Sequence, residues 1–321
     1  MAKLEFHKNP RIAIAGSVNS SARVLRKLIE YEMNIQWVLG LDPTISKNVS
    51  GFNDLGPIAE SASLDFSYFK KLNDDWILDG IKKRQIDLFF VIGLSQLVRT
   101  NLMNAPKVAC IGYHPTRLPK GRGRAAIAWI IMGKVDAAAS FFLLDEGTDS
   151  GHIIAQKPTQ LDGTEYPKDV IDKIMVSIDE AMDEVLPNIK KGWLSYHQQN
   201  EIQATYLGKR APSDGYLDWE LPAVDLQRLI RAVSHPLPGA ITFLGEKEIK
   251  VWRAEVWNSE NIVGVPGRIV KILENSFVVC TGEKHLEVVD WEGVALSELI
   301  EGHKLGINWV VLYRNYISNK K

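Results

Sequence analysis

A histidine and an aspartate about 35 positions apart are the residues of this chain best suited to chemistry. His114 follows the apolar run 108–111, and Asp149 lies in the polar turn DEGTDSG after the apolar run 140–144. A carboxylate beside an imidazole holds the ring in one tautomer and raises its basicity, which equips the histidine for proton transfer near neutral pH. On spacing alone, a structural histidine and a turn-forming aspartate are the more common interpretations.

Short apolar runs that alternate with helix-like segments predict the scaffold that carries these two residues. The start of the chain predicts a β-α-β unit, with a strand over 11–16, a helix over 20–31 and a strand over 35–39. Further buried parallel strands are expected at 88–92, 108–111 and 140–144. The fold class is therefore predicted to be α/β, with a Rossmann-like, largely parallel sheet and flanking helices.

The carboxyl edge of such a sheet is where a ligand is expected. Ligands of open parallel sheets bind beyond the carboxyl ends of the strands, and His114 emerges there from the strand 108–111. The glycine-bearing turn after 140–144 is expected to bring Asp149 to the same edge. The first loop contains neither GxGxxG nor GxxxxGK[ST], so nothing in it indicates a dinucleotide or a P-loop nucleotide.

A length of 321 residues favours two domains. The segment 168–186 carries an apolar stripe at helical spacing and is expected to close the first domain, at 1–200. Beyond it, short alternating runs separated by Gly, Pro and Asn predict a smaller β-rich, barrel-like domain of OB type at 208–315.

Composition excludes several classes of protein. Hydrophobic residues make up 45% and charged residues 24%, as in ordinary globular proteins, and the net charge of −1 gives no general attraction to nucleic acid or anionic lipid. The cysteines, Cys110 and Cys280, are far apart, so neither a disulfide framework nor a metal site is indicated. The N-terminus does not read as a signal peptide, and no run of about 20 apolar residues occurs. We expect a cytoplasmic protein without a membrane partner.

The block around His114 and Asp149 resembles the signature of the 10-formyltetrahydrofolate-dependent formyltransferases. That signature runs Asn-x-His, then a Leu-Pro-x-x-Arg-Gly loop, then an Asp-x-Gly turn. Here the segments 112–114, 118–123 and 149–151 read GYH, LPKGRG and DSG. GLSQLV at 93–98 is similar to the family's folate-contacting segment, and the segments 208–219 and 228–252 resemble the join to its C-terminal domain.

This resemblance implies an N-formyltransferase that uses 10-formyltetrahydrofolate as co-substrate and needs no metal. His114 would handle the proton of the attacking amine, and Asp149 would orient His114. The folate would be held by Gln96, Leu97, Val98, Arg124, Asp145, Glu146, Gly147 and Thr148. Without the resemblance, Gln96 to Val98 is an ordinary strand-to-helix connection and Arg124 a solvated cation. Candidate substrate contacts are Ser17, Asn19, Arg122, Lys209, Arg210 and Arg231. Core or capping roles fit Ser17, Asn19 and Arg231 at least as well, and a solvated surface position is the default interpretation of Lys209 and Arg210.

One position departs from the family pattern. Gly112 stands where the family has an asparagine that donates a hydrogen bond to the developing oxyanion. Loss of such a donor costs on the order of 10²–10³ in rate. We therefore expect a substitute donor, such as a backbone N–H, a water, His114 or Tyr113. The alternative is a catalytically impaired folate-binding protein, and hydrolysis of the formyl-folate is a third hypothesis.

The acceptor amine is expected to belong to a nucleotide-linked amino sugar, a UDP- or dTDP-4-amino sugar. From Gly208 to Lys321 there are 14 Lys and Arg against 15 Asp and Glu, without the basic surplus that binding to tRNA favours. The segments 122–129 and 208–219 are also more similar to the amino-sugar enzymes of the family. Methionyl-tRNA is the alternative acceptor, and the sequence leaves a homodimer open.

Overall fold

The protein consists of two compact units. The computed structural model describes residues 2–47, 49–258 and 262–306. The first unit comprises 1–126, 133–162 and 170–208, and the second comprises 127–132, 163–169 and 209–321. Residues 307–315 of the predicted second domain lie outside the described residues.

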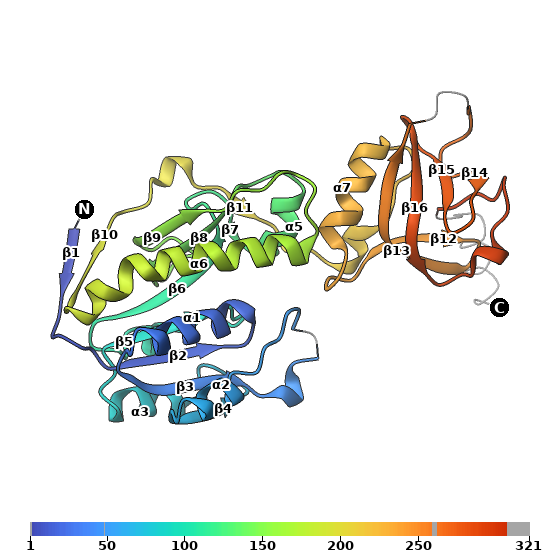
Figure 1. Cartoon of the computed structure of the whole chain (residues 1–321). Coiled ribbons are helices and arrows are strands. Elements are labelled where there is room, and N and C mark those ends of the chain that lie inside the picture. The colour runs from blue at the N-terminus through green and yellow to red at the C-terminus, as the bar shows by residue number, and fades with distance from the viewer. Residues whose placement is uncertain (1, 48, 259–261, 307–321) are drawn as a thin grey trace, which may run out of the picture. The chain divides into compact units, whose positions relative to one another are not determined.

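A seven-stranded sheet with the order β4-β3-β2-β5-β6-β8-β9 forms the centre of the first unit (Figure 1). The strands β4, β3, β2, β5 and β6 pair in parallel, which confirms the predicted Rossmann-like, largely parallel sheet. The strands are β2 (Ile12–Gly16), β3 (Ile35–Leu41), β4 (Phe66–Phe69), β5 (Leu88–Ile92), β6 (Ala109–Thr116), β8 (Ala137–Leu143) and β9 (Ile153–Pro158).

The strand predicted at 140–144 is present as β8, but the prediction that it is parallel was wrong. β8 pairs antiparallel with β6, with Gly112 opposite Phe142 and His114 opposite Ser140. β6 runs on beyond the ends of its parallel neighbours, so β8 begins outside the sheet's carboxyl edge and returns to it. The turn after β8 therefore still starts close to Gly112, although β8 points the other way.

Helices cover both faces of this sheet. Residues that alternate along β2 point to opposite faces, and Ala13 and Ala15 join Ile77 and Ile81 of α3 in one core cluster. On the other face α1 packs against β2 and β5 and is tied to α6 by the ion pair of Lys27 with Asp183, 2.6 Å long. The helices of this unit are α1 (Asn19–Glu30), α2 (Gly56–Ser61), α3 (Asp75–Lys83), α4 (Thr100–Met103) and most of α6 (Pro167–Lys190), whereas α5 (Ala126–Ile131) belongs almost entirely to the second unit.

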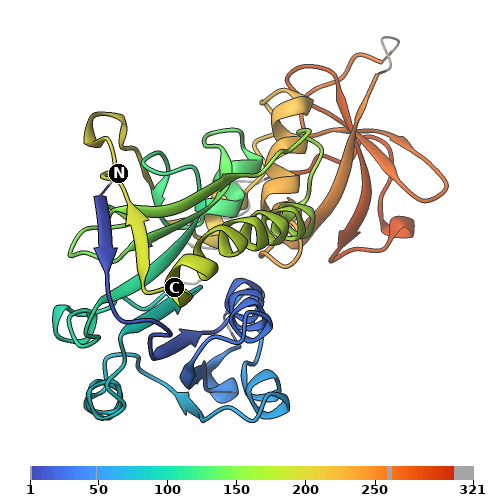
Figure 2. The same ribbon diagram turned by 60° about the vertical axis from the view of Figure 1, so that its left-hand side comes forward.

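Two small two-stranded sheets and two short 3-10 helices lie among the described connections of the first unit. β1 (Ala2–Glu5) pairs with β10 (Trp193–Tyr196), as Figure 2 shows. β7 (Arg122–Gly123) pairs in parallel with β11 (Tyr206–Leu207). The second pair matters for the site, because it joins the loop after His114 to a segment more than 80 residues later. The 3-10 helices of this unit are η1 (Pro43–Ile45) and η2 (Glu201–Gln203), and η3 (Pro212–Gly215) belongs to the second unit.

The second unit is the predicted β-rich, barrel-like domain. Its antiparallel sheet has the order β12-β13-β16-β15-β14. Residues Lys304 and Leu305 bridge to Arg268 and Leu244, so one segment contacts both edge strands. The helix α7 packs on β13 and buries Leu226 and Ile230 in the core. Its elements are α7 (Ala223–Val233), β12 (Ala240–Leu244), β13 (Lys247–Trp257), β14 (Ile269–Ile272), β15 (Phe277–Cys280), β16 (His285–Glu292) and η4 (Leu296–Glu298).

No helix within the described ranges is long and apolar enough to cross a membrane.

Candidate active site

His114 lies at the carboxyl edge of the parallel strands. Gly16 of β2 is level with Ile92 of β5, and Val91 is level with Gly112 of β6. His114 comes two residues later, just beyond the last parallel pairs. It shares a face of β6 with Gly112 because side chains alternate along a strand, and only 6% of its surface is exposed.

Both ring nitrogens of His114 face an oxygen. Nε2 is 2.8 Å from the carbonyl oxygen of Gly121, and Nδ1 is 3.5 Å from Oδ2 of Asp149. A neutral ring with its proton on Nε2 donates to Gly121 and turns the Nδ1 lone pair toward the carboxylate. A doubly protonated ring satisfies both neighbours, since each nitrogen then faces an acceptor. The arrangement is therefore suited to receive a proton at Nδ1.

The turn that carries Asp149 is held in place by backbone constraints. The N–H of Gly123 donates to Oδ2 of Asp149 at 2.8 Å, and Asp149 adopts a left-handed φ of 49°. A Cβ on Gly151 would lie 1.6 Å from the carbonyl oxygen of Leu143, so only glycine fits there. The structure thus brings His114 and Asp149 together, with side-chain exposures of 8% and 21%.

Gly112 leaves no empty space on the face it shares with His114. A Cβ built on it would lie 2.6 Å from Cδ2 of Leu144 and 3.0 Å from Cζ of Phe142. Tyr113 points to the opposite face and its ring packs on Phe141, with ring centroids 5.2 Å apart. Of the substitute donors considered from the sequence, the Tyr113 hydroxyl is therefore directed away from the His114 face.

The candidate folate-binding residues form a loop and a turn that are linked to each other. Leu97 is 83% exposed, whereas the side chain of Gln96 accepts from the N–H of Leu72 at 2.7 Å and Val98 packs into the core. Thr100 lies 3.4 Å from Glu146, which joins this loop to the exposed turn 145–148.

Arg124 is exposed immediately after Gly123, the residue whose N–H holds Asp149. The loop, the turn and Arg124 thus all adjoin the elements around Asp149.

The candidate substrate contacts are divided between the two units. Ser17 is buried and donates to the carbonyl oxygen of Gly93 at 2.9 Å, and the exposed Asn19 accepts from Asn53. Arg122 is completely buried, and its guanidinium makes five hydrogen bonds, to Gln199, Glu201 and Tyr206. Arg122 therefore has no donor left over for a substrate.

The other three candidates, Lys209, Arg210 and Arg231, belong to the second unit. Lys209 is exposed, and the guanidinium of Arg210 stacks over Trp129 at 5.1 Å. Arg231 is buried and donates to the carbonyl oxygen of Glu165 at 3.0 Å. Burial lowers the pKa of Arg231 from its ordinary value.

Two residues beside the pair were not found by sequence analysis. Leu144 fills the space next to Gly112, and Gln199 donates to the carbonyl oxygens of Asp149 and Gly151 at 2.8 and 2.7 Å. Gln199 lies in the polar stretch HQQN, which matches no motif, so the sequence contained no signal for its position.

A reactive cysteine and a metal centre are the other kinds of active site to consider. Burial raises the pKa of the Cys110 thiol, which fits a packed residue rather than a nucleophile. No group of three or more His, Cys, Asp and Glu that could hold a metal ion occurs in the part of the chain that the structure describes.

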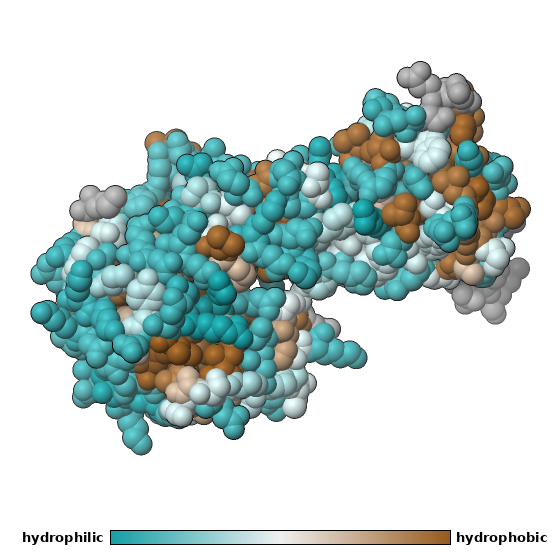
Figure 3. Space-filling view, in the orientation of Figure 1, coloured by the Kyte–Doolittle hydropathy of each residue, from teal (hydrophilic) through white to brown (hydrophobic). Residues whose placement is uncertain are grey.

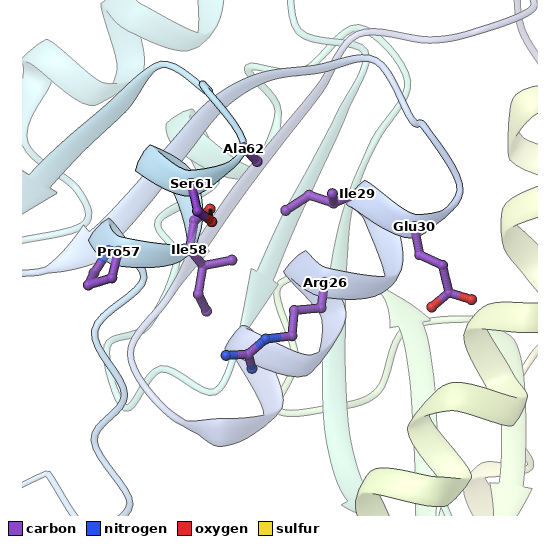
Figure 4. Close-up of a pocket in the computed structure, with 7 residues that line it drawn as sticks. All are labelled: Arg26, Ile29, Glu30, Pro57, Ile58, Ser61 and Ala62. Atoms are coloured by element: carbon purple, nitrogen blue, oxygen red, sulfur yellow. Dashed lines mark hydrogen bonds between the residues drawn. The ribbon is translucent and has the colours of Figure 1, made fainter.

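A shallow depression of about 590 Å³ lies between α1 and α2, lined by Ile29 and Ile58 among others (Figure 4). Figure 3 shows apolar side chains gathered in the region where Figure 1 draws these helices. The depression involves the last turn of α1, which points away from the carboxyl edge, so it includes none of the candidate residues.

Comparisons with known proteins identify the family. The family described as "Formyl transferase" matches residues 51–187, and "Formyl transferase, C-terminal domain" matches residues 209–296. The methionyl-tRNA formyltransferase of Agathobacter rectalis is 29% identical over 284 residues, which cover 87% of this chain and 91% of that protein. That of Lachnospira eligens is 25% identical over 288 residues, with 87% and 90% covered.

Solved structures share the fold at low sequence identity. WlaRD, a sugar 3N-formyl transferase, has a TM-score of 0.62 at 16% identity, covering 89% of this chain and 99% of that chain. HypX from Aquifex aeolicus in complex with tetrahydrofolic acid has a TM-score of 0.63 at 18% identity over 90% of this chain, which spans only 45% of HypX. The two formyl transferase models match consecutive parts of this chain and lead to one assignment. The chain belongs to the formyl transferase family and is an enzyme that transfers formyl groups.

Proposed function

We propose that the enzyme transfers a formyl group from 10-formyltetrahydrofolate to the amino group of a nucleotide-linked amino sugar. The observation that carries the proposal is the pairing of His114 Nδ1 with Asp149 Oδ2, 3.5 Å apart, at the carboxyl edge of the sheet. The boundaries 1–200 and 208–315 remain our proposal for the catalytic and the C-terminal domain.

The residues around this edge fit a folate. The exposed Leu97 offers an apolar surface, and Arg124 offers an exposed cation for an anionic tail. Neighbours of similar fold include HypX with tetrahydrofolic acid and WlaRD in the presence of 5-N-formyl-THF. When bound, the folate supplies a formyl group that is already activated. The chain's residues therefore have to position two reactants and move a proton.

His114 and Asp149 have complementary parts in the proton step. An amine that attacks a carbonyl carbon gains positive charge, and a base must remove its proton. Nδ1 of His114 receives that proton on the side of Asp149, whose carboxylate then faces an imidazolium. The bond between the formyl carbon and the folate nitrogen breaks as the new carbon–nitrogen bond is completed, and the imidazolium returns the proton to the departing folate nitrogen. Nε2 keeps its hydrogen bond to Gly121 throughout, so the ring need not turn.

An amino sugar as the acceptor is supported by charge and by the neighbours of similar fold. The last 114 residues, from Gly208 to Lys321, carry 14 basic and 15 acidic side chains, which gives no electrostatic footprint for a tRNA. WlaRD was solved in the presence of dTDP, and the N-formyltransferase of Helicobacter canadensis in complex with dTDP-3-aminofucose.

Methionyl-tRNA is the second candidate acceptor, and the curated relatives favour it. The proteins from Agathobacter rectalis and Lachnospira eligens match this chain along about nine tenths of their own length. A tRNA enzyme releases counterions on binding, so its affinity falls steeply with salt, whereas a nucleotide sugar responds weakly.

The test offers the purified chain and 10-formyltetrahydrofolate a panel of UDP- and dTDP-linked 3-amino and 4-amino sugars, with methionyl-tRNA alongside. Transfer to a sugar with a weak salt dependence is expected. Transfer to methionyl-tRNA alone, with a steep salt dependence, would show that the acceptor is methionyl-tRNA and not an amino sugar. Consumption of the formyl-folate without any amide product would favour a hydrolase, and folate binding without turnover an impaired enzyme.

A further inference from the structure

We propose that Gln199 is a positioning residue for the Asp149 carboxylate, and that it acts together with Arg122. The inference rests on the proposed role of the His114–Asp149 pair. Gln199 lies between β10 and η2, some 50 residues after Asp149, and only 4% of its surface is exposed.

The amide nitrogen of Gln199 holds the turn that carries Asp149. Nε2 donates to the carbonyl oxygen of Asp149 at 2.8 Å and to that of Gly151 at 2.7 Å. Both amide protons are thus donated in hydrogen bonds to the residues on either side of Ser150. Because Asp149 has a left-handed φ of 49°, this turn depends on such external contacts to keep its shape.

The amide oxygen of Gln199 accepts hydrogen bonds from the guanidinium of Arg122. Oε1 accepts from Nε of Arg122 at 3.2 Å and from Nη2 at 2.9 Å. Gly123, which follows Arg122 in the chain, donates its N–H to Oδ2 of Asp149. A closed ring of contacts therefore runs from Gln199 through Arg122 and Gly123 to Asp149 and back to Gln199.

Arg122 is fixed on its far side by an acidic and an aromatic residue. Glu201 accepts from Nη1 at 2.8 Å and from Nη2 at 2.6 Å, and Tyr206 accepts from Nη1 at 3.0 Å. The guanidinium has five N–H donors, and these two residues and Gln199 take all of them.

Charge and hydrogen-bond capacity explain why the bridging residue is glutamine. The bridge must accept two bonds from a cation at one end and donate two to carbonyl oxygens at the other, and a primary amide does both. A glutamate can accept from Arg122 but cannot donate to Asp149 and Gly151. A leucine of similar size can do neither.

The experiment compares Gln199→Glu and Gln199→Leu with a matched control, Gln36→Leu. Gln36 is a half-buried glutamine of the same unit whose side-chain amide donates to Oδ1 of Asn34. A displaced catalytic group costs on the order of 10²-fold in rate, so we expect kcat to fall by about 10²-fold in both Gln199 variants with KM little changed. Gln36→Leu should retain the wild-type kcat.

A double-mutant cycle separates positioning from a merely structural role. In an Asp149→Asn background the loss caused by Gln199→Glu should shrink several-fold, because the carboxylate it positions is already gone. If the double variant loses kcat by the product of the two single-variant losses, the two residues are not coupled and the proposal is overturned. If the Gln199 variants do not fold, Glu201→Ala releases Arg122 from the exposed side and should lower kcat in the same direction.

A readout independent of turnover keeps the inference distinct from the proposed function. In ¹⁵N-histidine NMR spectra of the full chain, the ring signals of His114, assigned by their absence in His114→Ala, should shift in Gln199→Leu and stay in place in Gln36→Leu. Unchanged His114 signals in Gln199→Leu would contradict the positioning role. Absence of formyl transfer by the wild type would instead contradict the proposed function alone.

Discussion

Leu144 occupies the space in which a side chain at Gly112 would have to lie, since a Cβ there would be 2.6 Å from Leu144 Cδ2. The atom in the way is the far end of a flexible side chain, and it packs with Leu118 and Phe142 in a small core cluster. The glycine that replaces the family's asparagine at position 112 and the side chain of Leu144 therefore share one space. The two positions should be tested together.

Gly112→Asn should destabilise the fold by about 1–3 kcal/mol, because the new side chain forces Leu144 out of its place. In combination with Leu144→Ala the cost should be smaller than the sum of the two single changes. Urea unfolding of the four proteins measures this, and strict additivity would mean that the two positions do not share the space.

The same double variant tests whether position 112 limits catalysis. An asparagine beside His114 would restore an oxyanion donor of the kind worth on the order of 10²–10³ in rate. If another group already supplies that hydrogen bond, Gly112→Asn with Leu144→Ala should not exceed the wild-type kcat. A gain of about 10²-fold would identify the wild type as the impaired enzyme.

Gly151→Ala should be far more damaging than an alanine at an unconstrained glycine. Its Cβ would lie 1.6 Å from the backbone oxygen of Leu143, and no rotamer change relieves that overlap. We expect a loss of about 3 kcal/mol or more in the free energy of unfolding, together with loss of activity. Gly208→Ala is the control, since no atom lies within 4 Å of its Cβ. Equal thermal midpoints for the two variants would show that the Asp149 turn is not constrained in this way.

Glu201 should make part of the stability depend on pH. The hydrogen bond from Arg122 lowers the pKa of the Glu201 carboxyl below its ordinary value of 4.5. The folded-state pKa therefore lies below the unfolded value, so the stabilisation is present above the unfolded value and is lost as the pH falls through the folded value. The difference in unfolding free energy between wild type and Glu201→Gln should be largest above pH 4.5 and shrink below it. A difference that does not change with pH would rule out this contribution.

The sequence predicted those parts of the fold that follow from local periodicity. The apolar runs at 35–39 and 88–92 and the helix near 168–186 are present as β3, β5 and α6. The proximity of His114 and Asp149 could also be anticipated, because ligand-binding residues gather where strands end.

The parts that were not predicted depend on contacts between distant segments. A buried apolar run carries no information on strand direction, so the antiparallel pairing of β8 was missed. Arg122 was named as a candidate substrate contact because its partner Glu201, 79 positions later, could not be recognised from the sequence. Gln199 was not recognised for the same reason, since its four bonds reach back across 48 to 77 positions.

The most direct measurement is the initial rate of formyl transfer from 10-formyltetrahydrofolate to the accepted amine for wild type, His114→Ala, Asp149→Asn and His152→Ala. His152 is an exposed histidine three residues after Asp149 and serves as the matched control. We expect His114→Ala and Asp149→Asn to lose about 10²–10⁴-fold in kcat while His152→Ala keeps the wild-type rate. Transfer at the wild-type rate by His114→Ala would contradict the account.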